Sequence, residues 1–443
     1  MNRLKFYISI FLARLIKLLI KIVGRSSGTS FIGMFKLKTN PDFLNFCSKY
    51  ILHEKISVTG TNGKTTTAGL IAQILEANNK EVIHNAQGAN MLTGIANVFA
   101  TNVVPSKRYD NCVLESDEAY LSKLYDYMKL DYLVVTNLFR DQLDRYGELD
   151  TTAKKIQSAI DKNKDLVLLL NADDPLVANL GHDNKKLYYG FENIEFAETH
   201  TISHAPAEMF NCICGKPLEY SKRFYAQQGH YYCSCGYKRP KCNYQGNAKI
   251  YSDYIEISVL HNGEETHYTF DSIGLYNAYN ALAAISMALE IGYKQEEIQN
   301  ALNTYKAMFG RAEKTEFNGH KTIIQLIKNP AGASEVLKTV DLSSKILIAI
   351  NDNFADGRDV SWLWDAEFEL LKDTEKTIVT SGIRANDMAL RLKYAGVPSE
   401  KIKVVPDLFE AVEEVSSSED KTEKVTIMPS YTALLQIKNY KRG

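Results

Sequence analysis

One stretch of the sequence has the residue types and spacing of a phosphate-binding loop. Residues 55–67 read KISVTGTNGKTTT, a short apolar segment followed by Gly60, Gly63 and Lys64. Glycines let backbone N–H groups approach phosphate oxygens, and the N-terminus of a following helix adds its dipole. Lys64 would neutralise the β- and γ-phosphates, and Thr65 would place a hydroxyl on Mg²⁺. The sequence therefore predicts a nucleotide loop, although Val58 stands where the common pattern has its first glycine.

A second group of residues has the composition of a metal site. Two Cys-x-Cys-Gly pairs are separated by 18 residues, and their cysteines are Cys212, Cys214, Cys233 and Cys235. Four thiolates on two tight turns suit a tetrahedral structural Zn²⁺. Because Cys-x-x-Cys is the more usual spacing, Cys242 and His230 remain alternative ligands, and reduced cysteines without metal are the other interpretation. We expect a zinc ribbon over about 205–245, whose metal stabilises a segment too small for its own core.

The elements that would position the phosphate loop alternate along the chain. Apolar runs at 82–83, 112–114, 132–135 and 166–170 look like buried strands, and the amphipathic stretches 66–77 and 151–161 lie between them. This alternation predicts a parallel α/β sheet with ligands at the carboxyl ends of its strands. A further apolar run, 346–350, predicts a strand of a second domain.

Length and charge limit the classes of protein that fit. With 443 residues, two or three domains are expected, and 45% apolar and 24% charged residues are ordinary for globular proteins. The net charge of −1 gives no reason to expect nucleic acid as a partner. Neither a cleavable secretory signal nor an unbroken apolar run long enough to span a membrane is present, so a cytoplasmic enzyme is expected.

The N-terminal stretch has a different composition from the rest. Residues 1–40 hold eight Lys or Arg and no Asp or Glu. Arg14, Lys17, Lys21 and Arg25 recur at three- and four-residue steps, which predicts one cationic helical face opposite an apolar one. Such a helix could lie, through residues 1–25, on the inner face of an anionic membrane. The alternative is a helix packed on the protein body with a solvated basic side.

Ordered motifs across the chain resemble the Mur ligases and folylpolyglutamate synthases. The loop TGTNGKTT at 59–66 is similar to their phosphate loop, Glu115 follows in the position of a magnesium-binding glutamate, and later matches cover 136–144, 170–175, 276–280, 310–311 and 328–330. The resemblance implies catalytic roles for Lys64 and Glu115, and Mg²⁺ binding by Thr65 and Glu115. It also implies ATP binding by a set of loop and distal residues: Gly60, Thr61, Asn62, Gly63, Lys64, Thr65, Thr66, Asn277, Asn280 and Arg311.

Departures from that pattern are equally informative. Only 58 residues precede Thr59, too few for the usual precursor-binding domain. Gln142 replaces a metal-binding His, which puts a second Mg²⁺ in doubt. Tyr276 and Lys328 also replace His, and Gln325 replaces an Asp that those ligases use with the incoming amino acid.

This combination resembles the MurT family, which shares the missing domain, the cysteine-rich insertion and an acidic stretch read here as NDNFADGRDVSW over 351–362. The resemblance implies a GatD-type glutaminase partner in a heterodimer, with Asp359 completing a catalytic triad whose Cys and His lie on that partner. A buried Asp fixes the tautomer and orientation of such a His.

The family resemblance implies both an architecture and an activity. We expect an α/β protein with a basic helix over 1–40, a central Mur-ligase-like ATP-binding domain over 41–313 that contains the zinc ribbon, and a Rossmann-like α/β domain over 314–443. The implied activity is ATP-dependent amidation of the D-glutamate α-carboxylate of lipid II through an acyl phosphate. A ligase that adds an amino acid is the alternative, and a non-enzymatic zinc-ribbon adaptor is a third hypothesis.

Overall fold

The computed structural model describes residues 3–22, 29–86, 89–139, 149–197, 211–306 and 310–440. Its larger sheet has nine strands in the order β11-β10-β9-β6-β5-β4-β1-β3-β2. The strands are β1 Lys55–Thr59, β2 Val82–His84, β3 Asn111–Glu115, β4 Tyr132–Val135, β5 Val167–Asn171, β6 Lys186–Phe196, β9 Tyr244–Ile250, β10 Ile255–His261 and β11 Glu264–Phe270. Neighbours from β2 to β9 pair in parallel, and β10 pairs antiparallel with both β9 and β11.

Alternation of side chains places consecutive apolar residues in two separate cores. Leu168 and Leu170 belong to one core and Leu169 to the other, because successive residues of a strand point to opposite faces. The face that receives Leu169 is covered by α4 Lys64–Ala77, α10 Leu275–Glu290 and α11 Gln295–Thr304. The opposite face is covered by α3 Phe43–Ser48, α5 Leu92–Asn102, α6 Leu121–Tyr125, α8 Leu149–Ile160 and α9 Pro175–Ala178. The predicted parallel α/β sheet is therefore confirmed.

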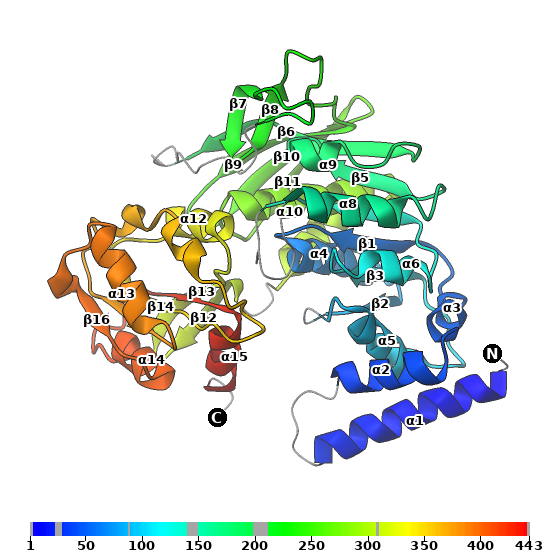
Figure 1. Ribbon diagram of the computed structural model, residues 1–443, viewed down its shortest axis with the longest axis horizontal. Coiled ribbons are helices and arrows are strands. Elements are labelled where there is room, and N and C mark those ends of the chain that lie inside the picture. The colour runs from blue at the N-terminus through cyan, green and yellow to red at the C-terminus, as the bar shows by residue number, and fades with distance from the viewer. Residues whose placement is uncertain are drawn as a thin grey trace.

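The N-terminal segment forms two helices where one was expected over 1–40. Helix α1 spans Arg3–Ile22 and α2 spans Thr29–Thr39, and both pack on α5 at the lower right of Figure 1. A Cβ on Gly33 would lie 1.7 Å from the carbonyl oxygen of Thr93, so only glycine permits this close approach of α2 to α5. Among the described residues, no helix combines the length and the apolar character needed to cross a membrane.

The solvent side of α1 carries apolar as well as basic residues. Phe6, Ile10 and Ala13 are buried against the body, whereas the opposite side exposes large apolar residues, namely Tyr7, Ile8, Phe11, Leu12, Leu15 and Leu18. Arg14 donates a hydrogen bond to the carbonyl oxygen of Val103 at 3.2 Å, at the edge of the packed side. Arg14 and Lys17 are exposed, and apolar residues lie both against the body and toward solvent, so the described part of the helix has a second apolar side beside its basic residues. Lys21 has no described side chain, and Arg25 lies outside the described residues.

The cysteine-rich segment forms a small hairpin at the top of Figure 1, made of β7 Glu219–Tyr225 and β8 Gln228–Tyr232. It packs on the larger sheet near β6 and β9, in a satellite core with Ala178 and Tyr188. The hairpin turn, Ala226-Gln227, has a positive φ of 44° at Ala226. Residues 198–210, which include the predicted start of the ribbon, lie outside the described part of the chain.

A second sheet forms the C-terminal part of the molecule, with strand order β12-β13-β17-β14-β15-β16. Its strands are β12 Arg311–Phe317, β13 His320–Gln325, β14 Lys345–Ala349, β15 Ile378–Ser381, β16 Ile402–Val404 and β17 Val425–Pro429. The β12–β13 pair is antiparallel and the other pairs are parallel. The helices around it are α12 Pro330–Lys338, η1 Ser361–Trp364, η2 Phe368–Leu371, α13 Ala385–Tyr394, η3 Ser399–Lys401, α14 Leu408–Ser416 and α15 Tyr431–Tyr440. The strand predicted at 346–350 is β14.

Candidate active site

The phosphate loop connects β1 to α4 and takes its shape from two glycines. Gly60 has φ of 125° and Gly63 has φ of 84°, both in the region that side chains disfavour. A Cβ on Gly63 would lie 2.0 Å from Oδ1 of Asn280 on α10. Gly63 therefore lets the loop and Asn280, two elements of the predicted nucleotide site, approach one another.

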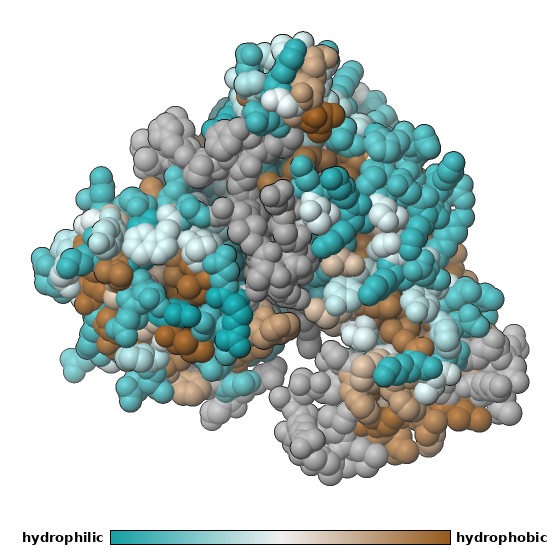
Figure 2. All heavy atoms as spheres, viewed as in Figure 1, coloured by the Kyte–Doolittle hydropathy of each residue, from teal (hydrophilic) through white to brown (hydrophobic). Residues whose placement is uncertain are grey.

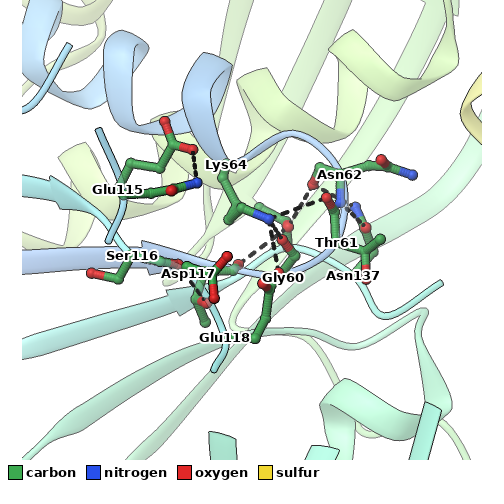
Figure 3. A network of polar contacts seen from close by, with 12 residues as sticks. Gly60, Thr61, Asn62, Lys64, Glu115, Ser116, Asp117, Glu118 and Asn137 are labelled. Atoms are coloured by element: carbon green, nitrogen blue, oxygen red, sulfur yellow. Dashed lines mark hydrogen bonds and ion pairs between the residues drawn. The ribbon is translucent and has the colours of Figure 1, made fainter. Parts of the chain in front are cut away.

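A second loop, which follows β4, braces the phosphate loop. Asn137 accepts a hydrogen bond from the backbone N–H of Asn62 at 2.8 Å, and its carbonyl oxygen accepts the N–H of Thr61 at 2.8 Å. The hydroxyl of Thr136 donates to the carbonyl oxygen of Asn62 at 2.7 Å. These contacts, drawn in part in Figure 3, fix the loop before a ligand arrives. A loop held in this way needs no rearrangement during the reaction.

Lys64 is the most deeply buried charge of the loop. Its side chain lies 2.8 Å from Oε1 of Glu118 and donates to the carbonyl oxygens of Gly60 and Thr61, the latter at 3.2 Å (Figure 3). Burial opposes the charged form of Lys64, but the charge and hydrogen bond of Glu118 outweigh it and raise the lysine pKa. Lys64 is therefore protonated at neutral pH. Glu118 was not predicted as a site residue, although it stands three residues after Glu115.

The two predicted Mg²⁺ ligands meet beside Lys64. The hydroxyl of Thr65 donates to Oε2 of Glu115 at 2.8 Å, and the amide of Asn90 donates to the other carboxylate oxygen at 3.1 Å. Hydroxyl and carboxylate oxygens are the ligands that Mg²⁺ prefers. These residues fit a magnesium ion that would neutralise phosphate charge.

A pocket opens beside the loop, between the central sheet and the C-terminal part of the chain. Of the predicted nucleotide residues, Asn62, Gly63, Thr66 and Asn280 line it. Asn277 lies behind them, donating to the carbonyl oxygen of Ile273 at 2.9 Å and accepting from Asn280 at 3.3 Å. Asn277 thus orients Asn280. The backbone of Arg311 begins β12, but its side chain lies outside the described part of the chain.

Two contacts join the domains across this pocket. Asn329 caps α12 by accepting the N–H of Gly332 at 2.8 Å, and its amide donates to Oδ1 of Asn62 at 3.1 Å. Tyr276 donates its hydroxyl proton to Oε1 of Gln325 at 3.0 Å. Tyr276 and Gln325 are two of the departures from the ligase pattern, so the two replacements form a pair. Gln142 and the rest of 140–148 lie outside the described residues.

The four cysteines of the ribbon converge as predicted. Their Sγ atoms all lie within 4.8 Å of one another, with 3.7 Å between Cys212 and Cys235 and between Cys214 and Cys233. Tetrahedral Zn²⁺ with bonds of about 2.3 Å separates its sulfurs by about 3.8 Å, so the cluster fits such an ion. Within the described residues, this cluster contains neither Cys242 nor His230, whose ring nitrogen contacts the carbonyl oxygen of Phe191 at 2.8 Å.

The acidic stretch after β14 contains carboxylates in different environments. Asp356 is buried and accepts the N–H of Thr432 at 2.7 Å, at the start of α15. Asp352 pairs with Arg384 at 2.7 Å. Asp359 lies on the more open part of the loop, where one carboxylate oxygen accepts the N–H of Ser361 at 2.8 Å. Asp352 and Asp356 therefore stabilise the loop that presents Asp359, which is not among the described residues that line the pocket.

Comparison with known proteins agrees with this architecture. Residues 58–213 match the family described as Mur ligase middle domain, and residues 326–434 match the family described as MurT ligase C-terminal. The lipid II isoglutaminyl synthase (glutamine-hydrolysing) subunit MurT of Staphylococcus aureus is 35% identical over 96% of this chain and 95% of the relative. Its counterpart from Streptococcus pneumoniae is also 35% identical, over 94% of this chain and 95% of the relative.

Solved structures show the same fold at lower identity. A pseudomurein peptide ligase type C from Methanothermus fervidus superposes with a TM-score of 0.69 at 22% identity, covering 91% of this chain and 80% of that one. The MurF ligase from Thermotoga maritima, solved with ADP, superposes with a TM-score of 0.64 at 13% identity. The match covers 92% of this chain and 85% of that one. The near-full-length identity and the matched C-terminal family together show that the chain belongs to the MurT family of Mur-ligase-like proteins.

Proposed function

We propose that this chain is the ATP-using subunit of a lipid II isoglutaminyl synthase. The observation that supports this most strongly is the 35% identity over 96% of the chain to subunits so named. In the chain itself, the phosphate loop, Lys64 and the Thr65–Glu115 pair lie beside a pocket between two domains. This arrangement suits the activation of a carboxylate by ATP.

The proposed reaction has two steps. A carboxylate oxygen of the D-glutamate residue attacks the γ-phosphorus of ATP, which releases ADP and leaves an acyl phosphate. Ammonia then attacks the carbonyl carbon, inorganic phosphate leaves, and an amide remains after loss of a proton. Lys64 would stabilise charge on the transferring phosphoryl group, and Thr65 and Glu115 would bind the Mg²⁺ that neutralises the phosphates. Asn280 and Asn62 would position the nucleotide.

A partner subunit would supply the ammonia. Four of the seven cysteines converge in one cluster, where a bound metal would occupy their thiolates, and Cys47, Cys112 and Cys242 are buried, so none is offered as a free nucleophile. Burial raises the pKa of Cys47 and of Cys112 and so disfavours the reactive thiolate. We therefore assign glutamine hydrolysis to a glutaminase of the GatD type.

The surface around Asp359 has the character of a docking site for that partner. Phe354, Trp364, Ile383 and Tyr394 are exposed on the loop after β14 and on the neighbouring α13 segment. Exposed aromatic residues near a functional carboxylate are typical of the central residues of an interface. Asp359 would orient a histidine of the partner, as the Asp of a catalytic triad does.

The exposed apolar side of α1 suits contact with a membrane that carries a lipid-linked substrate. Figure 2 shows hydrophobic side chains gathered at the lower right, over α1 and α2. Phe31, Met34 and Phe35 of α2 extend the apolar surface of α1. No acidic residue occurs in 1–40, so nothing there repels anionic headgroups. We propose peripheral binding at the inner face of the membrane.

The decisive experiment is mass spectrometry of lipid II after incubation with ATP, Mg²⁺ and glutamine. This chain alone, a glutaminase of the GatD type alone, and both together are compared. We expect a loss of about one mass unit, the exchange of OH for NH₂, only when both chains are present. A gain of one amino-acid residue would instead establish a ligase that adds an amino acid. An unchanged substrate with no ATP consumption would contradict both.

A further inference from the structure

The tip of the zinc-ribbon hairpin reaches the pocket beside the phosphate loop. Tyr225 ends β7 and Gln228 begins β8, and the two lie opposite each other across the turn. Both line the pocket that Asn62, Gly63 and Asn280 also line. The hairpin has its cysteine cluster at one end and this pocket at the other. The ribbon therefore contributes a wall to the nucleotide site.

The tip is anchored from the central sheet. The amide of Gln227 donates to the carbonyl oxygen of Leu138 at 2.6 Å, directly after the residues that brace the phosphate loop. The N–H of Gly229 donates to the carbonyl oxygen of Asp173 at 2.9 Å. Bonds on both sides of Gln228 thus fix where its side chain can lie.

The side chain of Asp173 connects the ribbon to α10. It is fully buried, with one oxygen 2.6 Å from Nε of Arg239 and the other accepting the hydroxyl proton of Tyr279 at 2.9 Å. Arg239 follows the second cysteine pair, and Tyr279 lines the same pocket as Gln228. This ion pair sets the position of the ribbon relative to the pocket.

The walls next to the tip are largely aromatic. The rings of Tyr225 and Phe139 have centroids 5.2 Å apart, and the ammonium group of Lys338 lies 5.2 Å from the centre of the Tyr225 ring. Phe139, Tyr276 and Tyr279 complete the aromatic lining. An aromatic pocket next to a phosphate loop is suited to the base of a nucleotide, since every base has a π face that stacks.

Gln228 adds a buried polar group to this pocket from the ribbon. It is 2% exposed, and within the described residues its Nε2 has no hydrogen-bond partner. A buried amide donor without a partner is costly and indicates a ligand acceptor. A carboxamide offers one donor and one acceptor side by side, which matches the ring nitrogen and amino group on an adenine edge. Guanine presents a different set of hydrogen-bonding groups, with a carbonyl oxygen in place of that amino group.

We propose that the ribbon tip recognises the adenine base and that Gln228 makes ATP the preferred nucleotide. This inference rests on the proposed function, because it takes the bound nucleotide to be ATP. The ribbon would then contribute to nucleotide binding in addition to holding a metal, because the side chain that selects the base belongs to this insertion.

The test compares binding of ATP and GTP to the full chain by calorimetry. Gln228→Met keeps the size of the side chain and removes the amide, and Gln228→Glu removes the donor. We expect each to weaken ATP binding by about 10-fold, the effect of one lost buried hydrogen bond, and to leave GTP binding within about twofold. Unchanged GTP binding shows that the pocket is still folded. Gln245→Met on β9 is the matched control, because Gln245 does not line the pocket.

The outcomes separate the two proposals. If the unaltered chain binds neither nucleotide, the proposed function fails. If it binds ATP and both Gln228 variants bind ATP with the original affinity, only base recognition by Gln228 is overturned. A parallel loss of ATP and GTP binding in both variants would also overturn it, because that pattern would mean a loss of pocket structure without base selection.

Discussion

The two acidic regions of this chain, the segment after β3 and the loop after β14, differ in how their carboxylates are used. Glu115 and Glu118 are buried, and each contacts a phosphate-loop side chain, Thr65 or Lys64 respectively. Asp359 is half-buried on a loop whose sequence neighbours Phe354 and Trp364 are exposed. The first region forms a site whose members all lie within this chain. The second presents one carboxylate to groups that another chain would have to provide.

This contrast predicts that substitutions in the two regions remove different steps of the proposed reaction. Damage at the phosphate loop removes the ATP step, on which every form of the proposed reaction depends. Damage at the Asp359 loop removes only the supply of ammonia. Free ammonia therefore distinguishes the two regions, because it replaces the product of the partner without replacing ATP.

The largest effect is expected from Lys64→Met. Methionine retains the apolar stem but removes the charge that would stabilise the transferring phosphoryl group, so amidation should fall by about 1,000-fold. The loss should be the same with glutamine or with ammonium chloride as nitrogen source. Amide formation is measured by mass spectrometry with both subunits present. Lys123→Met on α6, outside the loop, is the control. Rescue of the Lys64 variant by ammonium would contradict the assignment of the phosphate loop to the ATP step.

A smaller and selective effect is expected from Asp359→Asn. The amide cannot stabilise a partner histidine as a carboxylate does, so glutamine-dependent amidation should fall by about 100-fold. Amidation driven by ammonium chloride should remain within about twofold of the unaltered protein. Asp365→Asn, six residues along the same segment, is the matched control. Equal loss with both nitrogen sources would place Asp359 in the ATP step instead.

A moderate effect is expected on assembly from Trp364→Ala. The Trp364 ring packs against Tyr394 with centroids 5.6 Å apart and has the guanidinium of Arg391 at 5.6 Å, so it is held in one orientation. Truncating such an anchor costs about 2 kcal/mol at an interface, or about 30-fold in Kd. Analytical ultracentrifugation with the glutaminase measures this. Leu260→Ala on β10, an exposed apolar residue of the central domain, should leave the Kd unchanged.

The features that could be predicted from sequence are those encoded by local spacing. The phosphate loop, the strands that follow it and the four-cysteine cluster each depend on residues a few positions apart or on a simple period. Glu118 was missed because a carboxylate three residues after Glu115 carries no sign of the lysine that it contacts. Gln228 was missed for a stronger reason. Its position in the pocket depends on bonds to Leu138 and Asp173, about 90 and 55 residues away, which no local pattern encodes.

The apolar residues that α1 buries against the body could not be predicted for a related reason. Spacing identified a helix with two kinds of side chain, but packing on α5 determines which side is covered. Phe6, Ile10 and Ala13 are buried there, and the remaining apolar residues face outward. The helix therefore differs from an isolated amphipathic helix, because it has apolar residues for both the body and an outside surface.

The smallest effect is expected on membrane binding, from Phe11→Ser. Phe11 is 66% exposed on the outer side of α1, and its loss should lower binding to vesicles that contain phosphatidylglycerol by about fivefold, the value of partly burying one aromatic ring. Phe354→Ser is the matched control, because Phe354 is 77% exposed but belongs to the Asp359 loop. That control should weaken the partner complex and leave vesicle binding unchanged, and Phe11→Ser should do the reverse. Vesicle co-sedimentation and ultracentrifugation of the same two variants would then show that the outer side of α1 binds the membrane and that the Asp359 loop binds the partner subunit. If both variants lost vesicle binding equally, the membrane contact could not be assigned to α1.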